Sequence, residues 1–578
     1  MHWKMALKKS VWLFLLMAVL AFPLVGCSQP STSTPTASSP SSSSSPSPTP
    51  SSSSPSPTAT AAKEKIIRQT NSWPLVMDPG VGSDYTASEM FCNLYDSLVF
   101  PNVDGSVKPW VATKWDISAD GLTYTFTLRD DVKFHSGNLL TADDVVFSLN
   151  RMLAIGEGYG YLFTANVKGA KTIDTYKVEF TLKQPFGPFL AALVRLYILD
   201  QKQVVANKKD GSYGENGDYG KDWLITHDAG SGPYKVKETK VEEYVVAEKF
   251  ADYWGGFGPN APDQFKEIGT TQPVTVKTMI SRRELEISDQ WQTAEALVGL
   301  AKIPGITVMT AFSGGVCNIM LNTKKAPTDD LHFRRALAYC VDYETVANTL
   351  FPGSRQAKGP VGSDTPGADP TVFQFKQDMT KAAEELKQSK YADSLDANPV
   401  DLAWVAEVPD EEKIALLVQA NAAKIGIKVN VVKVPWLSVI ANMAKMETTA
   451  HASIVMVAPH YNEAGSMLES RYSSKSTGTW EQGEWLQDPT IDAAIADSIA
   501  TIDQKARFEK YAAIQKQIVD LCPTIFLFDQ AERAAYQSDY VDWPAADDVL
   551  AGKPVNQVMG YRFYFRDFSV FPDKIPNP

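Results

Sequence analysis

The side chains that most often do chemistry are sparse in this sequence of 578 residues. It has six histidines and five cysteines, which are scattered, with no C-x-x-C pair and no metal-ligand spacing. Neither a G-x-S-x-G nucleophile elbow nor an H-E-x-x-H zinc motif is present. We therefore expect no catalytic centre, no metal and no cofactor. Carboxylates are numerous, however, so a secreted hydrolase whose two acids meet only in the fold remains an alternative.

The N-terminus carries the clearest signal for a modification. Residues 1–26 have the build of a secretory signal peptide, with three lysines ahead of an apolar run over residues 11–25. This run is shorter than the roughly 20 residues of a comfortable membrane span. It ends in Leu24-Val-Gly-Cys27, which resembles the bacterial lipobox. That resemblance implies cleavage before Cys27 and lipidation of its sulfur.

Residues 27–62 follow as a tether. Almost all of them are Ser, Pro, Thr or Ala, without a charge or an aromatic ring, so the segment cannot bury enough apolar surface to fold. Its prolines favour an extended chain that reaches on the order of 100 Å when stretched. No later stretch is apolar enough to span a membrane, so the lipid is the only membrane contact that we expect.

The part of the chain after the tether is acidic. The formal net charge of the whole chain is −12, and the leader contributes lysines but no acids. A nucleic-acid partner usually requires a basic face, so we expect none. The length of this part predicts more than one domain.

Periodic patterns in the first half predict strands and helices in alternation. Apolar and polar residues alternate over 122–128 and over 176–182, which is typical of half-buried strands. Between them, Thr141 stands three residues before Asp144, a near capping box that predicts the start of a helix.

Similar patterns continue in the second half. A strand over 400–405, a helix that stops at Gly426 and a strand over 427–434 predict a β-α-β unit with parallel pairing. A long helical pattern covers 491–521, and residues 525–528 resemble a buried strand.

Several blocks occur in a characteristic order along the chain. The first group is Tyr95-Asp-Ser-Leu-Val99, Val107-Lys-Pro-Trp-Val-Ala112, Asp120-Gly-Leu-Thr-Tyr-Thr-Phe-Thr-Leu-Arg129, Val132-Lys-Phe-His-Ser-Gly137 and Leu140-Thr-Ala-Asp-Asp-Val-Val-Phe-Ser148. The later group is Gly230-Ser-Gly-Pro-Tyr234, Asp252-Tyr-Trp-Gly255, Leu321-Asn-Thr-Lys-Lys-Ala-Pro327 and Phe333-Arg-Arg-Ala-Leu-Ala-Tyr339. In order and spacing, over residues 66–570, they resemble the bacterial extracellular solute-binding proteins of family 5. That family includes oligopeptide-, dipeptide- and nickel-binding proteins of ABC importers.

The resemblance implies an α/β fold with two lobes, of the type II, cluster C periplasmic-binding-protein class, and an extra subdomain on lobe one. The implied division is lobe one over 63–104, 184–316 and 523–578, the subdomain over 105–183, and lobe two over 317–522. Cys317 and Cys522 would then lie near the two crossings between the lobes. A disulfide between them is a hypothesis, and buried free thiols are the alternative.

The resemblance also implies a function. Such a protein captures a small ligand between its lobes and delivers it to ABC permease subunits without covalent chemistry. We expect a monomer, lipid-anchored at the outer face of the cell membrane in the extracytoplasmic space, with an oligopeptide as ligand. A receptor for an oligosaccharide, or one that presents its ligand to a sensor, is an alternative.

Five residues are predicted to bind the ligand. Peptide-binding members place an aspartate opposite the free amino terminus, and His460 stands in its place here, although an imidazole cannot supply a fixed negative charge. Tyr461 and Glu463 lie beside it. Trp436 matches a tryptophan that lines the family pocket, and Tyr85 belongs to the lobe-one segment that faces the ligand.

Two other ligand classes remain open. Aromatic walls with neutral polar groups would suit an oligosaccharide. A nickel or metal-chelate site is a further variant in the family, for which His460 and His451 are the only nearby imidazoles.

Overall fold

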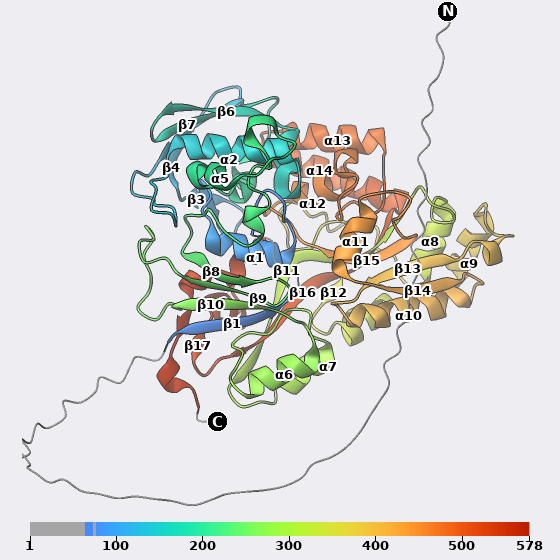
Figure 1. Cartoon of the computed structure of the whole chain (residues 1–578). Helices are drawn as coiled ribbons and strands as arrows, with labels where there is room; N and C mark the ends of the chain where they lie inside the picture. The colour runs from blue at the N-terminus through green and yellow to red at the C-terminus, as the bar shows by residue number, and fades with distance from the viewer. Residues whose placement is uncertain (1–63, 73–76, 577–578) are drawn as a thin grey trace, which may run out of the picture. The chain divides into compact units, whose positions relative to one another are not determined.

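The computed structural model describes residues 64–72 and 77–576. The predicted signal peptide (residues 1–26), the lipidation predicted at Cys27 and the tether (residues 27–62) lie outside this part. The described residues form one unit by their internal contacts, built from several sheets and the helices that cover them (Figure 1).

The larger sheet has six strands in the order β12-β16-β11-β15-β13-β14. They are β11 (Ile306–Leu321), β12 (Arg355–Gln356), β13 (Val400–Val405), β14 (Val429–Val434), β15 (Ala452–Val457) and β16 (Thr524–Gln537). Strand β13 pairs in parallel with β14 and β15, whereas β11 pairs antiparallel with β15 and β16. The predicted β-α-β unit is therefore confirmed, with α10 (Asp410–Ala423) as its crossover helix.

A second sheet has four strands in the order β1-β10-β9-β8. They are β1 (Ile66–Asn71), β8 (Tyr234–Lys240), β9 (Tyr244–Lys249) and β10 (Gln264–Gly269). Strand β1 pairs in parallel with β10. Ile287 forms isolated bridges with both Gln69 and Tyr536, so this sheet is connected to the end of β16.

Strands β11 and β16 pair with each other over most of their length. Residues 306–312 of β11 pair with residues 531–537 of β16, and the pairing resumes at Val316 after an irregularity. Gly314, with φ of 72°, lies inside this interruption, where a residue with a side chain would be strained. The interruption lies beside the predicted boundary at 316/317, and that boundary stays a prediction.

A smaller sheet in the order β4-β5-β7-β6 lies within residues 105–183. Its strands are β4 (Ala112–Ile117), β5 (Thr123–Leu128), β6 (Val167–Asp174) and β7 (Lys177–Leu182), and α2 (Ala142–Ile155) packs on it. Both predicted strands are confirmed by β5 and β7. The predicted capping box is also confirmed, because the Thr141 backbone N–H donates to Asp144 Oδ2 at 2.9 Å.

The helix predicted over 491–521 is two helices, α13 (Pro489–Ala500) and α14 (Gln504–Leu521). The break falls at residues 501–503. The Asp503 side chain accepts a hydrogen bond from Ala506 N at 2.8 Å, so it caps a new helix start. The strand predicted over 525–528 is confirmed, and it is part of the longer β16.

The proposed disulfide between Cys317 and Cys522 is wrong. Both thiols are free and buried, as are those of Cys92 and Cys340. Thr524 pairs with Met320 in the sheet, so Cys522 lies beyond the end of β11. That places it roughly 15 Å along the strand from Cys317, whereas a bridge needs Cα atoms within about 7 Å.

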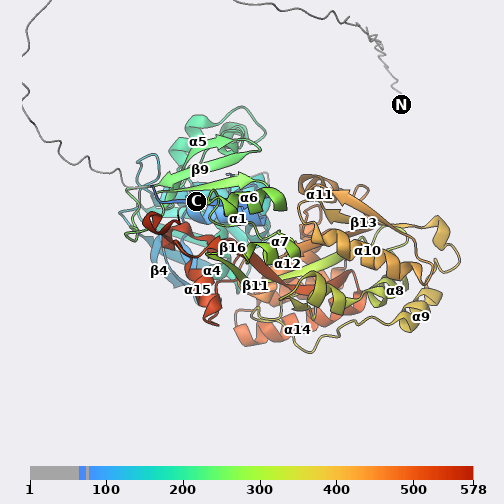
Figure 2. The same cartoon turned by 90° about the horizontal axis from the view of Figure 1, so that it is seen from below.

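Further helices cover the sheets. They are α1 (Tyr85–Leu94), α5 (Gln201–Asn207), α6 (Pro273–Ser281), α7 (Ala294–Leu300), α8 (Leu331–Cys340), α9 (Met379–Gln388), α11 (Trp436–Met443), α12 (Ala464–Tyr472) and α15 (Pro544–Leu550). Figures 1 and 2 both show α8, α9 and α10 beside β13 and away from β4. Over residues 64–72 and 77–576, no helix combines the length and apolarity of a membrane span.

A buried ion pair ties α2 to the segment before α1. Arg151 Nη1 and Nη2 donate to the two carboxylate oxygens of Asp78, both at 2.6 Å, and Arg151 Nε donates to Tyr219 O at 2.9 Å. Both side chains are almost fully buried. Such a pair is costly to break, because the remaining charge stays buried without its partner.

We expect Asp78→Ala to lower the free energy of unfolding by about 3–5 kcal/mol, measured by chemical denaturation. The matched control is Asp131→Ala, which removes the solvent-exposed partner of Arg129 and should cost at most about 1 kcal/mol. If both variants lose the same free energy of unfolding, burial of the Arg151–Asp78 pair does not add to the stability of the fold.

Candidate functional site

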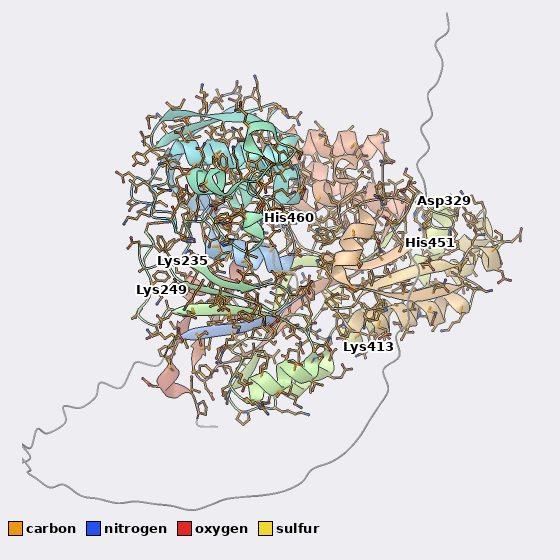
Figure 3. The ribbon with its side chains drawn as sticks, viewed as in Figure 1. Lys235, Lys249, Asp329, Lys413, His451 and His460 are labelled. Atoms are coloured by element: carbon orange, nitrogen blue, oxygen red, sulfur yellow. The ribbon has the colours of Figure 1, made fainter. Side chains whose placement is uncertain are left out.

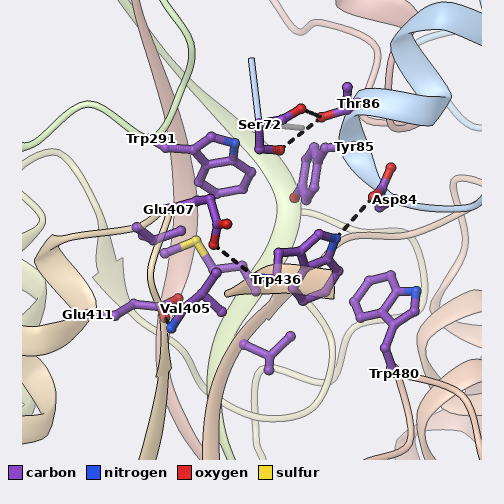
Figure 4. Close-up of a pocket in the computed structure, with 13 residues that line it drawn as sticks. Ser72, Asp84, Tyr85, Thr86, Trp291, Val405, Glu407, Glu411, Trp436 and Trp480 are labelled. Atoms are coloured by element: carbon purple, nitrogen blue, oxygen red, sulfur yellow. Dashed lines mark hydrogen bonds between the residues drawn. The ribbon is translucent and has the colours of Figure 1, made fainter. Parts of the chain in front are cut away.

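A cavity lies between the amino-terminal part of the fold and the six-stranded sheet (Figure 4). The first side of the cavity is lined by the β1–α1 region and the segment after Ile287. The second side is lined by β13, by β15 and by the loops that follow β13 and β14. The lining residues are Ser72, Asp84, Tyr85, Thr86, Trp291, Val405, Glu407, Val408, Glu411, Trp436, Val455, Met456 and Trp480.

The start of α1 supplies the first wall. Asp84 is the N-cap of this helix, and its Oδ1 accepts a hydrogen bond from Ala87 N at 2.9 Å. Tyr85 follows it, and its hydroxyl donates to Gln530 Oε1 on β16 at 2.6 Å. The Tyr85 ring packs edge-on against Trp291, with 5.4 Å between ring centroids. The cap therefore fixes an acid and an aromatic ring side by side.

The second wall begins at the carboxyl end of β13, where open α/β sheets commonly bind ligands. Glu407 follows the strand, and its Oε2 accepts from Trp436 N at 3.0 Å at the start of α11. Glu411 is buried and accepts from Val405 N at 2.8 Å. Trp436 packs edge-on against Trp480 with centroids 5.0 Å apart. Two glutamates and two indoles thus face the first wall.

One hydrogen bond joins the two walls directly. Trp436 Nε1 donates to Asp84 Oδ2 at 3.1 Å, between residues 352 positions apart in the chain (Figure 4). Asp84 uses its other oxygen for the helix cap, so a single carboxylate serves both contacts. The structure therefore shows the cavity with its walls in contact.

The cavity is acidic and aromatic. Three of its lining residues are carboxylic acids, and none carries a basic side chain. Burial raises the pKa of Asp84. Burial also raises the pKa of Glu411 well above its usual range, and the neighbouring Glu407 adds to this shift. Glu411 is buried, whereas Glu407 is only half-buried.

The five residues predicted from the sequence fall into two groups. Tyr85 and Trp436 line the cavity, on opposite walls. His460, Tyr461 and Glu463 are buried elsewhere and do not line it. Their predicted contact with a ligand stays a prediction.

His460 lies in a buried polar cluster. Its Nδ1 is 2.5 Å from the Tyr161 hydroxyl, its Nε2 is 3.4 Å from Glu481 Oε1, and its backbone carbonyl accepts from Arg195 Nε at 2.7 Å. Burial lowers the pKa of His460 well below its usual range, and the positive charge of Arg195 adds to this effect. The imidazole is therefore neutral.

Glu463 and Tyr461 are buried among other side chains of the protein. The Glu463 carboxylate accepts from Arg507 Nε and Nη2 at 2.7 and 2.8 Å, and from the Tyr511 hydroxyl at 2.8 Å. The Tyr461 hydroxyl is buried without a hydrogen-bond partner among the described residues. Glu463 is thus already neutralised by an arginine.

The histidines considered for a metal site are separate. Figure 3 shows His460 and His451 in different parts of the fold. His451 Nδ1 accepts a hydrogen bond from Asp401 N at 3.1 Å. Within residues 64–72 and 77–576, no three His, Cys, Asp or Glu side chains are grouped to hold a metal ion.

Sequence reasoning missed five acidic or aromatic lining residues: Asp84, Trp291, Glu407, Glu411 and Trp480. Two signals were available for the acids. Asp84 has the residue type of an N-cap just before a helix, and Glu407 follows a strand whose carboxyl end is a typical ligand edge. Nothing in the local sequence distinguishes Trp291 or Trp480 from core tryptophans.

Two lobes that meet over a cavity define a class of binding protein that closes around a solute. Residues 106–479 match the model described as bacterial extracellular solute-binding proteins, family 5 middle region, and the chain belongs to this family.

Characterised relatives cover most of the chain. The probable D,D-dipeptide-binding periplasmic protein DdpA of Escherichia coli K12 is 27% identical over 479 residues, which are 81% of this chain and 88% of the relative. The nickel-binding periplasmic protein of the same organism is 26% identical over 470 residues, covering 78% and 87%.

Solved structures confirm the two-lobed α/β fold. Helicobacter pylori DppA in complex with the peptide STSA has a TM-score of 0.76 at 23% identity, covering 87% of this chain and 98% of that one. Campylobacter jejuni NikZ in complex with Ni(L-His) has a TM-score of 0.74 at 20% identity, covering 88% and 100%.

The buried acid Glu411 gives a pH test of the site. Its pKa is higher in the folded chain than its ordinary value of 4.5, so its contribution to stability is complete below pH 4.5 and is lost as the pH rises through the folded pKa. Glu411→Gln keeps an acceptor for Val405 N but cannot ionise. We expect thermal unfolding to show a smaller loss of stability between pH 5 and 9 in this variant than in the parent.

The control for this measurement is Glu412→Gln, because Glu412 is the next residue and is exposed. It should keep the parent's pH dependence. A Glu411→Gln curve parallel to the parent curve would contradict a raised pKa at Glu411.

Proposed function

We propose that this chain is an extracytoplasmic receptor that captures a peptide between its lobes and delivers it to an ABC permease. The observation that carries this proposal is the hydrogen bond from Trp436 to Asp84 across a cavity lined from both sides. A ligand held by both walls favours the closed form, because only that form contacts it from two sides. Lobe one over 63–104, 184–316 and 523–578, its subdomain over 105–183 and lobe two over 317–522 are the proposed division.

The choice of peptide has two supports. Several relatives are named as binding D,D-dipeptides, dipeptides, di- and tripeptides or oligopeptides. The acidic, aromatic lining suits an ammonium group, through charge and through cation–π contact. An oligosaccharide would use the rings but not the acids, and it is the alternative ligand. The proposed role includes no turnover, and the ligand leaves unchanged.

We also propose that the receptor is a monomer held at the outer face of the membrane by lipid on Cys27. The lipobox-like Leu24-Val-Gly-Cys27 and the tether over 27–62 support this arrangement. A tether on the order of 100 Å when extended keeps the receptor near its permease and lets it turn.

Asp84→Asn tests the contact between the walls. Asparagine caps helices as well as aspartate does, but its single oxygen cannot serve both Ala87 N and Trp436 Nε1. We expect the dissociation constant of a bound dipeptide to rise about tenfold, as the loss of one hydrogen bond to a charged group implies. Calorimetric titration measures this change.

The matched control is Asp503→Asn, which changes the cap of α14 outside the cavity lining and should leave affinity unchanged. If the parent protein is stabilised by di- to hexasaccharides and by no di- to hexapeptide in a thermal shift panel, the peptide proposal is wrong.

Cys27→Ser tests the anchor. The variant lacks the thiol that would be lipidated, so we expect it in the soluble extracytoplasmic fraction, without incorporation of labelled palmitate. The parent chain should stay with the membrane. Equal membrane retention of parent and variant would contradict lipid anchoring through Cys27.

A further inference from the structure

The loop after β15 makes a second contact between distant parts of the chain, away from the cavity. His460 belongs to this loop and is fully buried. Its Nδ1 lies 2.5 Å from the Tyr161 hydroxyl, and its backbone carbonyl accepts from Arg195 Nε at 2.7 Å. These partners are 299 and 265 positions away in the chain. His460 thus joins the loop to two segments of the amino-terminal part, once through its side chain and once through its backbone.

Aromatic rings enclose the imidazole at this contact. The Tyr159 ring lies edge-on to the His460 ring with 5.0 Å between centroids, and the Tyr161 ring is tilted at 5.7 Å. The Arg195 guanidinium lies 4.8 Å from the centroid of the Tyr159 ring. Separation of the loop from these side chains would therefore move the imidazole from a buried site into water.

A buried acid faces the imidazole from its own side of the contact. Glu481 Oε1 lies 3.4 Å from His460 Nε2, and both side chains are almost fully buried. Among the described residues, neither His460 Nε2 nor Glu481 Oε2 has a hydrogen-bond partner. Arg471, whose charge acts on Glu481, forms its ion pair with Glu484 at 2.6 Å. The imidazole and the Glu481 carboxyl are thus the two groups between which a proton at this contact is shared.

Burial acts on these two groups in opposite directions. It lowers the pKa of His460 well below its usual range, and the charge of Arg195 lowers it further. It raises the pKa of Glu481 to about 8, against the opposing effects of Ser470, Arg471 and Arg195. In the closed contact at pH 7, a neutral imidazole therefore lies beside a protonated acid.

Other titratable or charged groups surround the pair. Those from the amino-terminal part are Tyr159, Tyr161 and Arg195, and those from the second half of the chain are Tyr461, Glu469, Arg471 and Glu484. Burial also raises the pKa of Glu469 to about 8, so this acid adds a pH dependence of its own. Glu469 is the same in variants of His460 and Glu481, so a comparison of these variants with the parent isolates the pair.

We propose that His460 and Glu481 form a proton-controlled clasp, which joins the loop after β15 to the amino-terminal part of the fold and stabilises the closed form before any ligand binds. This inference goes beyond the proposed function, because it concerns the protein without ligand. It rests on the proposed division, in which Tyr161 and Arg195 lie on the side of lobe one and the clasp residues lie in lobe two.

The number of bound protons gives the direction of the effect. In an open form with both side chains in water, Glu481 ionises above about pH 4.5 and His460 loses its proton above about pH 6.5. Between these values, closing moves one proton from the imidazole to the acid, so pH has no net effect. Between pH 6.5 and 8, closing takes up one proton, so the closed form weakens about tenfold for each pH unit.

Hydrogen–deuterium exchange of the full chain without ligand measures this opening. Mass spectrometry follows fragments that cover residues 158–164 and 458–466, with correction for the intrinsic exchange rate at each pH. In the parent protein we expect both fragments to open about ten- to thirtyfold more at pH 8 than at pH 6.5. In Glu481→Gln this change should be about twofold or less, and opening should instead increase about tenfold from pH 6.5 to 5.5, because His460 alone then titrates.

Two further variants separate the clasp from general effects of buried acids. His460→Gln keeps an acceptor for the Tyr161 hydroxyl but cannot take up a proton, so its opening should increase steadily from pH 5.5 to 8. Glu385→Gln removes the acid of a different His–Glu pair, which it forms with His332 at 2.7 Å, and should keep the parent's profile. Equal profiles for the parent and Glu481→Gln, or a change in one of the two fragments alone, would overturn the proposal.

The outcomes also separate this inference from the proposed function. If the predicted pH profiles are not found but a dipeptide binds, the clasp is wrong and the peptide receptor stands. If the profiles are found and no peptide binds, the clasp stands and the proposed ligand is wrong.

Discussion

The hydrogen bond between Trp436 Nε1 and Asp84 Oδ2 is the contact on which the closed site depends. It forms only because the N-cap of α1 uses one carboxylate oxygen and leaves the other for a partner. It also needs Trp436 at the first position of α11, where the Glu407 carboxylate holds its backbone N–H. The contact between these distant parts of the chain therefore depends on three local features: the N-cap of α1, the start of α11 and the Glu407 carboxylate.

Burial of this contact sets the electrostatics of the cavity. Burial raises the pKa of both Asp84 and Glu411. A cation inside the cavity would offset this cost, because charge interactions strengthen as the local dielectric constant falls.

Parts of the fold could be predicted from the sequence because the patterns were local. Alternation identified β5 and β7, and the apolar runs around Gly426 identified β13, α10 and β14. The break between α13 and α14 was missed, because the helical period continues across it and only the cap at Asp503 marks the restart. The predicted Cys317–Cys522 disulfide was wrong because the pairing register of β11 and β16 cannot be read from the sequence.

The site was harder to predict. Tyr85 and Trp436 were found through the family resemblance, and both line the cavity. Asp84 and Glu407 were missed because acids are common and the contact that makes them special joins segments more than 300 residues apart.

Small-angle X-ray scattering, with and without a saturating dipeptide, tests closure around a ligand most directly. If the two walls meet over the ligand, the radius of gyration falls when the dipeptide binds, and the ligand-free protein includes a more open form. A dipeptide that saturates the protein by calorimetry yet leaves the scattering curve unchanged would contradict ligand capture by closure of the two lobes.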